Sequence, residues 1–158
     1  MSETVGLPAP ARAALQAFAT VFPEAPSAAS SLGAAWAPGR INLIGEHTDY
    51  NAGYVLPLAV DRVVALVGRA RTDQRVRLWS LHFQERAEFS LAGLPATFEP
   101  VSQALPHWAR YVLGVATELS RAGLALTGFE AVIQGDVPVG GGMSSSAALE
   151  IASVQAFQ

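Results

Sequence analysis

The sequence predicts an α+β protein in which strands and helices are mixed along the chain. Two patterns support this class: apolar or alternating runs of strand length, and runs whose apolar residues recur every three or four positions. Hydrophobic residues make up 51% of the 158 positions, and the formal net charge is −3. A chain of this length can bury a core of its own.

Composition narrows the class of function. The charge balance gives no reason to expect a nucleic-acid partner, and the chain has no cysteine for disulfides or thiolate-bound metal. We find no signal peptide and no apolar run of membrane-spanning length, so we expect a cytoplasmic protein with no membrane partner. All ten basic residues are arginine. A phosphate site would therefore use backbone amides, hydroxyls, arginine and metal rather than lysine.

The first half of the chain is predicted to begin with a helix over residues 9–22. Proline is tolerated in its first turn, and Pro23 follows its end. A short strand is expected from Arg40 to Ile44. The apolar run 63–67, which ends at Gly68, is typical of a buried strand.

The middle of the chain is predicted to contain a strand pair. The polar stretch 69–74 is interpreted as a hairpin turn that leads into a half-exposed strand over 75–81. Residues 87–91 can pair with that strand. Residues 93–106 contain three prolines and are predicted to be a loop.

Helical spacing returns over residues 107–122, where Trp108 and Tyr111 share one apolar face and Gly123 ends the helix. Residues 129–134 alternate and are predicted to be a strand. A last helix is expected to begin near the serine run 144–146 and to continue to the end of the chain. Core packing alone would explain Trp108 and Tyr111 in the helix predicted over 107–122.

Polar side chains crowd a loop bounded by Gly45 and Gly53, which Arg40 precedes. They include two carboxylates, an imidazole, a hydroxyl and an amide, from Glu46, His47, Thr48, Asp49 and Asn51. Such groups suit a sugar, because carboxylates accept hydrogen bonds from hydroxyls more strongly than neutral groups do. A solvated polar turn is the alternative, since these residue types also favour turns.

A second polar segment places glycines and then serines between a strand and a helix. Glycines let backbone amides approach an anion, and the first turn of a helix presents unpaired amides and a favourable dipole. Serine hydroxyls can donate to phosphate or ligate Mg²⁺. The segment is Gly140, Gly141, Gly142, Met143, Ser144, Ser145 and Ser146. A flexible turn with a serine helix cap is the alternative.

Three segments carry a resemblance to one family. Residues 39–51 resemble the galactokinase signature within the GHMP family of small-molecule kinases. Residues 137–147 are similar to the second GHMP signature, with Met143 where the family usually has leucine. Residues 108–115 resemble a segment that borders the adenine pocket in galactokinases.

This resemblance implies a fold and a reaction. The fold is the N-terminal (ribosomal protein S5 domain 2-like) domain of GHMP kinases, a mixed sheet with helices on one face. We expect residues 1–158 to be that domain, incomplete and without its C-terminal domain. The reaction is ATP-dependent phosphorylation of galactose at the C1 hydroxyl, with ATP and Mg²⁺, by a parent protein that we expect to be a monomer.

The resemblance also implies roles for individual residues. Arg40 would stabilise the transition state, and Ser146 would ligate Mg²⁺. Sugar hydroxyls would be held by Glu46, His47, Thr48 and Asp49. The nucleotide would contact Ser80, Trp108, Tyr111, Gly140, Gly141, Gly142, Met143, Ser144, Ser145 and Ser146. His82 and His107 are interpreted as surface or satisfied residues, and Glu150 as structural.

Other parts of the family site are expected beyond Gln158. They include the aspartate base that accepts the sugar's proton and a second Mg²⁺-ligand glutamate. Since loss of a general base typically slows a reaction by a factor of about 10²–10⁴, we expect the chain alone to be nearly inactive.

Three alternatives stay open. The parent protein could phosphorylate N-acetylgalactosamine or another sugar, although Thr48 and Asn51 favour plain galactose. It could be a non-catalytic galactose- and ATP-binding sensor on the same fold. The chain could also be a gene remnant that binds neither ligand.

Overall fold

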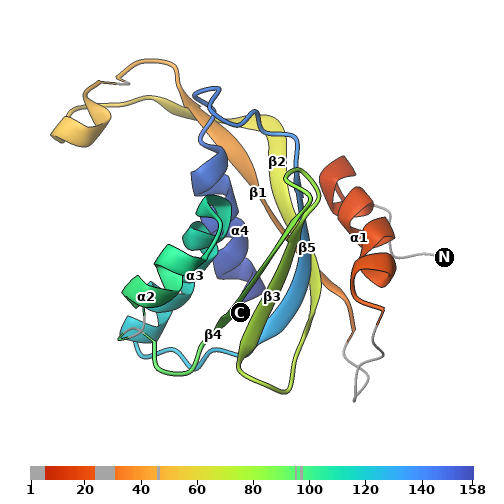
Figure 1. The fold of residues 1–158 in the computed structure, drawn as a ribbon. Helices are drawn as coiled ribbons and strands as arrows, with labels where there is room; N and C mark the ends of the chain where they lie inside the picture. The colour runs from red at the N-terminus through yellow and green to blue at the C-terminus, as the bar shows by residue number, and fades with distance from the viewer. Residues whose placement is uncertain (1–5, 24–30, 46, 95, 97) are drawn as a thin grey trace.

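The structure is a computed structural model that describes residues 6–23, 31–45, 47–94, 96 and 98–158. Figure 1 shows the arrangement of the elements. In chain order they are α1 (Ala9–Val21), β1 (Gly33–Asn42), the 3₁₀ turn η1 (Asp49–Asn51), β2 (Pro57–Ala70), β3 (Arg75–Ser80), β4 (Glu85–Ser90), α2 (Phe98–Ala104), α3 (His107–Arg121), β5 (Phe129–Gly135) and α4 (Ser145–Ala156).

The strands form one mixed sheet in the order β1-β2-β5-β3-β4. The β5–β3 pair is parallel, and the other neighbours are antiparallel. The hairpin turn predicted at 69–74 is wrong, because β5 lies between β2 and β3 and pairs with both. That partner strand comes much later in the chain, so no local pattern reveals it.

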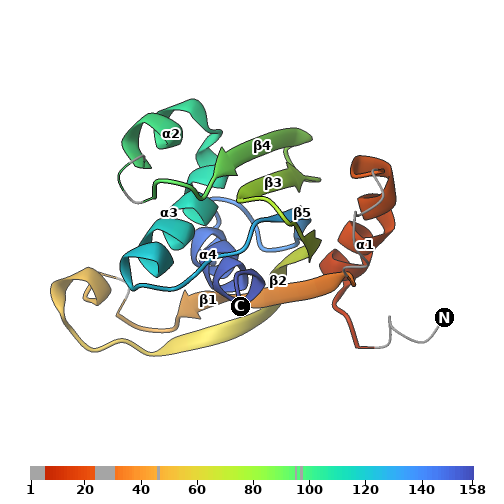
Figure 2. The same cartoon turned by 90° about the horizontal axis from the view of Figure 1, so that it is seen from below.

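Helices cover both faces of the sheet, as Figure 2 shows. One face carries α2, α3 and α4. The helix α1 lies on the opposite face. Three small or aromatic residues of α1, Ala11, Ala14 and Phe18, pack there against Ala65, Val67 and Val132. The central strands β2 and β5 therefore bury residues on both sides, which explains why the apolar run in β2 is nearly continuous. In the described part of the chain, no helix has the length and apolar character needed to cross a membrane.

The larger core lies between the sheet and the helices α3 and α4. Leu66 of β2 and Leu78 of β3 are buried there, together with Val112 and Leu113 of α3. The helix α4 adds Ala148, Leu149 and Ala152. This packing fixes the start of α4 against the end of the sheet, where the candidate site lies.

The bounds of one strand and the presence of one helix differ from the prediction. The strand β1 begins at Gly33 and ends at Asn42, so it starts well before the expected 40–44. Its first residues are mostly small, and pairing with β2 makes them a strand. The segment 93–106 was predicted to be a loop but contains α2. Pro100 is tolerated there because it lies in the first turn, and Phe98 packs on the core.

The chain between β1 and β2 projects beyond the sheet (Figure 1). At the base of this projecting loop, which we define as residues 43–56, the Leu43 amide donates to the Leu56 carbonyl at 2.9 Å. The Leu56 amide donates to the Ile44 carbonyl at 3.1 Å. The two sides of the loop therefore stay paired past the ends of the strands.

Candidate functional site

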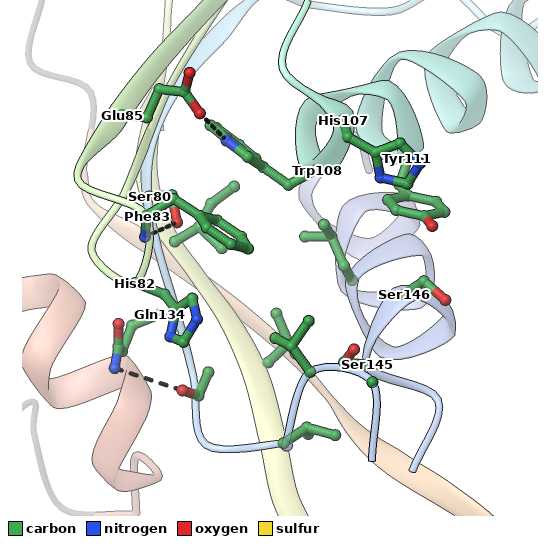
Figure 3. Close-up of a pocket in the computed structure, with 17 residues that line it drawn as sticks. Ser80, His82, Phe83, Glu85, His107, Trp108, Tyr111, Gln134, Ser145 and Ser146 are labelled. Carbon is green, nitrogen blue, oxygen red and sulfur yellow. Dashed lines mark hydrogen bonds between the residues drawn. The ribbon is translucent and has the colours of Figure 1, made fainter. Parts of the chain in front are cut away.

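A cavity of about 550 Å³ lies where the end of the sheet meets α3 and the start of α4. Figure 3 shows its lining side chains, which come from β2, the end of β5 and the loop after it, the β3–β4 turn, α3 and α4. Six of the residues assigned to a nucleotide from the sequence line it: Ser80, Trp108, Tyr111, Gly140, Ser145 and Ser146. Three segments that are distant in the sequence thus meet around one space.

Aromatic rings form one wall of this cavity. Trp108 is 8% exposed, and its indole N–H donates to the Glu85 carboxylate at 3.0 Å. The Phe83 ring is nearly parallel to the Trp108 ring, with 6.4 Å between centroids and 12° between planes. The Tyr111 ring meets the His107 ring edge-on at 5.5 Å. Such a wall can stack against a planar base.

Ser80 is buried on the sheet side of the cavity, with 4% of its surface exposed. Its hydroxyl oxygen accepts a hydrogen bond from the Phe83 amide at 3.2 Å. This bond closes the turn between β3 and β4 and thereby directs Phe83 toward the cavity. Ser80 thus shapes the wall as well as lining it.

The glycine–serine loop leads directly into α4. Gly140 and Gly142 have φ angles of 73° and 72°, and Ser144 has a φ of 53°. The first amides of α4 cannot have partners within the helix, and Ser144 makes no side-chain cap bond to them. Gly141, Gly142, Met143 and Ser144 belong to this loop but do not line the cavity.

Arg40 joins β1 to that loop. Its backbone N–H donates to the Met143 carbonyl at 3.0 Å, and its Nη2 donates to the Ser144 hydroxyl oxygen at 2.9 Å. The sequence-based assignments to sugar and to nucleotide thus meet at one arginine. This link was not expected from either motif alone.

The projecting loop is held by its own hydrogen bonds. The Thr48 hydroxyl is within donating distance of two carbonyl oxygens, those of Gly45 at 3.0 Å and Tyr54 at 2.9 Å. The Asn51 side-chain amide donates to the His47 carbonyl at 2.9 Å, and the His47 Nδ1 lies 3.0 Å from the Tyr50 hydroxyl. The hydroxyl proton of Thr48 is therefore engaged within the loop, and only the oxygen's acceptor capacity is open to a ligand.

The other sugar assignments are only partly described. Glu46 lies outside the described residues, and Asp49 is placed only as the first residue of η1. His47 and Thr48 do not line the cavity. Arg40, which the sequence assigns to the transition state, is brought to the glycine–serine loop by the structure.

Several residues of the cavity wall were not assigned to the site from the sequence, and four of them have aromatic or ionisable side chains: His82, Phe83, Glu85 and His107. His107 could have been found, because it stands four positions before Tyr111 and shares its helical face. The other three lie in or next to the β3–β4 turn. They reach the cavity only because that turn packs beside α3, and no local pattern shows this.

The described residues contain no cluster of three or more His, Cys, Asp or Glu side chains that could hold a metal ion. Among the described residues, hydroxyls could contribute to a cation site together with the oxygens of a bound phosphate. Mg²⁺ is suited to such a site, since it prefers oxygen and is often bound partly through substrate phosphates. The Ser146 side chain lines the cavity and offers one such hydroxyl.

Two family models match the chain. Residues 16–70 match the galactokinase galactose-binding signature. Residues 110–158 match the GHMP kinases N terminal domain. The first match contains Arg40 and the projecting loop, and the second contains most of α3, the glycine–serine loop and α4.

Curated relatives are similar over most of this chain. A galactokinase of Chloroflexus aurantiacus is 46% identical over 122 residues, which are 77% of this chain and 30% of that protein. The galactokinase of Bos taurus is 44% identical over 149 residues, 92% of this chain and 36% of that protein. The chain thus spans about a third of the length of the curated relatives that it matches.

Solved structures share the fold. The crystal structure of Lactococcus lactis galactokinase complexed with galactose superposes with a TM-score of 0.73 at 38% identity, and covers 87% of this chain and 34% of that one. The Methanococcus jannaschii mevalonate kinase superposes with a TM-score of 0.63 at 18% identity, over 84% of this chain and 40% of that one. The second likeness concerns the fold alone.

Proposed function

Because the chain belongs to the galactokinase family of GHMP kinases, we propose that the protein transfers the γ-phosphoryl group of ATP to the C1 hydroxyl of galactose. The observation that carries this proposal is the contact of Arg40 with Ser144. It joins the galactose-binding signature to the glycine–serine loop beside an aromatic-walled cavity. A kinase for a small molecule needs these two parts to be adjacent.

The nucleotide would occupy the cavity and the start of α4. Trp108 and Tyr111 would flank the base, with Ser80 beneath them. The loop from Gly140 to Ser146 would surround the phosphates with backbone amides and hydroxyls, since a helix start favours an anion. Ser146 would hold a Mg²⁺ ion, which when bound neutralises phosphate charge.

The projecting loop would hold the sugar. Glu46, His47 and Asp49 would bind its hydroxyls, and Thr48 would keep the loop in shape through its bonds to Gly45 and Tyr54. Arg40 would stabilise the charge that develops during transfer, because its guanidinium stays ionised and is planar.

Residues 1–158 would form the N-terminal domain of this kinase. The share of the relatives that the chain spans supports this division. We propose that the base that accepts the sugar's proton lies in the part of the kinase beyond residue 158. The 158-residue chain alone should then bind nucleotide, but turn over at least about 10²-fold more slowly than a complete galactokinase.

The experiment is an assay of galactose-dependent ADP release by the complete protein, with the product identified by phosphorus NMR. We expect galactose 1-phosphate, and little product from N-acetylgalactosamine. Arg40→Ala and Ser146→Ala should each reduce kcat by about 10²-fold or more. The matched control is Arg121→Ala, which removes an exposed arginine paired with Glu118 on α3 and should leave kcat unchanged.

Other results would point elsewhere. Faster turnover of N-acetylgalactosamine than of galactose would change the substrate. Ligand-dependent stabilisation by galactose and ATP without any ADP from a complete protein would favour a sensor. Failure of a folded protein to bind either ligand would contradict the proposed function.

A further inference from the structure

Arg40 holds the loop before α4 through both its backbone and its side chain. The backbone N–H donates to the Met143 carbonyl at 3.0 Å, and Nη2 donates to the Ser144 hydroxyl oxygen at 2.9 Å. Arg40 also lies close to the end of β1, at the base of the projecting loop. One residue therefore contacts the glycine–serine loop and lies three positions before the projecting loop.

An irregularity in β1 makes the backbone bond possible. The pairing of β1 with β2 shifts register between Pro38 and Arg40, and such a bulge redirects a strand N–H away from its usual partner. Because β1 is at the edge of the sheet, this N–H can reach a segment outside it. A Cβ on Gly39 would lie 2.7 Å from the Met143 carbonyl oxygen, so glycine permits the close approach.

Ser144 adopts a conformation that its neighbours must support. Its φ and ψ of 53° and 50° are left-handed, which costs a residue other than glycine roughly 1–2 kcal/mol. Its hydroxyl oxygen accepts from Arg40 instead of capping α4. A hydroxyl that accepts from a cation keeps its own proton for another acceptor. Arg40 thus leaves Ser144 able to donate to an anion at the start of α4.

We propose that Arg40 couples the two ligand sites, so that binding of the sugar raises the affinity for the nucleotide. A sugar held by the projecting loop would restrict the loop's base, where Arg40 lies. Arg40 would in turn hold Ser144 in its left-handed conformation. The second ligand then orders fewer groups and loses less conformational entropy. By linkage the effect is reciprocal. This inference rests on the proposed function, since both ligands must bind.

The test is calorimetric titration of the full chain with a non-hydrolysable ATP analogue and Mg²⁺, with and without saturating galactose. For the wild type we expect galactose to tighten analogue binding about fivefold or more, as for other coupled sites. Two variants should bring this ratio to within about twofold of one. Arg40→Lys keeps the charge without the planar fork, and Ser144→Gly removes the hydroxyl but tolerates the left-handed backbone.

The ratio separates coupling from a merely structural role, because a weakened fold would lower both affinities and leave their ratio unchanged. Arg121→Ala on α3 is the control and should keep the wild-type ratio. The proposal is overturned if both variants keep that ratio, or if the wild type binds both ligands with a ratio near one. A protein that binds the nucleotide analogue but never binds galactose would contradict the proposed function itself, and the coupling with it. A protein that binds neither ligand would do the same.

Discussion

The Trp108 indole N–H donates to the Glu85 carboxylate at 3.0 Å, which ties α3 to the first residue of β4 in the wall of the cavity (Figure 3). Trp108 is nearly buried, whereas Glu85 is exposed. Glu85→Ala should therefore let the indole move, and should weaken nucleotide binding by about 1 kcal/mol, or roughly fivefold. Titration calorimetry with an ATP analogue measures this.

Glu85→Gln is the matched control for that prediction. Its amide oxygen can accept the same hydrogen bond, so nucleotide affinity should stay close to the wild-type value. Equal affinity in Glu85→Ala and the wild type would show that the indole is held by packing alone.

The bulge at Gly39 gives a prediction for stability. A Cβ there would meet the Met143 carbonyl oxygen at 2.7 Å, and would also lie 3.0 Å from a Val137 methyl carbon. Gly39→Ala should lower the free energy of unfolding by roughly 1–3 kcal/mol, because backbone atoms must shift. Urea denaturation followed by circular dichroism measures the change.

Gly114 supplies a control of opposite sign. It lies inside α3, and apart from its chain neighbours and the nearby helix backbone no atom of the described residues stands within 4 Å of the Cβ it would gain. Gly114→Ala should raise the free energy of unfolding by about 0.5–1 kcal/mol, since glycine loses more backbone entropy in a helix than alanine does. If both alanine variants changed stability equally, the tight approach at Gly39 would not be the cause.

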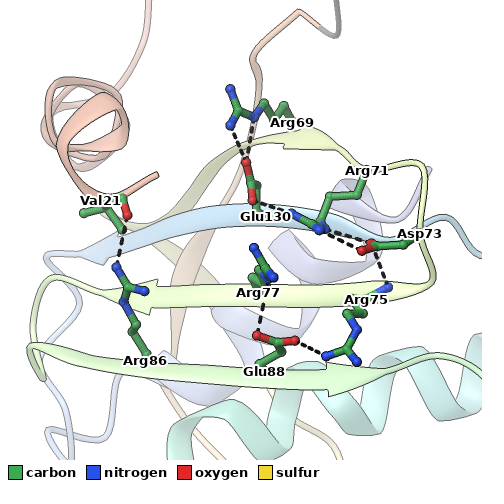
Figure 4. Close-up of polar contacts among 9 residues, drawn as sticks. All are labelled: Val21, Arg69, Arg71, Asp73, Arg75, Arg77, Arg86, Glu88 and Glu130. Carbon is green, nitrogen blue, oxygen red and sulfur yellow. Dashed lines mark hydrogen bonds and ion pairs between the residues drawn. The ribbon is translucent and has the colours of Figure 1, made fainter. Parts of the chain in front are cut away.

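A buried carboxylate organises the arginines on the sheet face that carries α1 (Figure 4). Glu130 has a side chain only 4% exposed, and it bonds Arg69 at 2.6 Å and Arg71 at 2.7 Å. Glu130→Ala removes the charge shared by two mostly buried cations, so it should lower the free energy of unfolding by about 3–5 kcal/mol. Denaturant titration is again the measurement.

A more exposed carboxylate on the same face is the comparison. Glu88 is 40% exposed and forms ion pairs with Arg75, which is 59% exposed, and with Arg77, which is 33% exposed. Glu88→Ala should cost no more than about 1 kcal/mol, because exposed ion pairs contribute little. A loss at Glu130 as small as that at Glu88 would mean that burial does not strengthen the network.

Much of the fold follows from local pattern. The helix α3 shows clear amphipathic spacing, and Gly123 ends it with a φ of 84°. The hairpin predicted at 69–74 failed because the partner of both flanking strands, β5, is remote in the sequence. The helix α2 was missed because Pro100 suggests a loop, although the first turn of a helix accepts it.

The candidate site likewise contains some residues that local sequence patterns predict and some contacts that they do not. The glycine–serine loop and Trp108 are visible in the sequence because each is a local motif. The bond from Arg40 to Ser144 depends on a bulge in β1, and the bond from Trp108 to Glu85 depends on how a turn packs beside α3. Contacts of this kind arise from tertiary structure, so only coordinates reveal them.

Asp73 gives a prediction for the pH dependence of stability. Hydrogen bonds from the Arg71 side chain and, to a smaller extent, from the Arg75 amide lower the pKa of this carboxyl from 3.8 to about 2. A carboxyl whose folded pKa is lowered contributes stability above its unfolded pKa, and this stability is lost as pH falls through the folded value.

The difference in unfolding free energy between the wild type and Asp73→Asn should therefore be constant above pH 5 or so. It should shrink as the pH falls from about 4 toward 2. Urea titrations over that range measure it. Because Asp73 is 43% exposed, solvent screening keeps the effect small, and a difference independent of pH would show that the pair with Arg71 does not persist in solution.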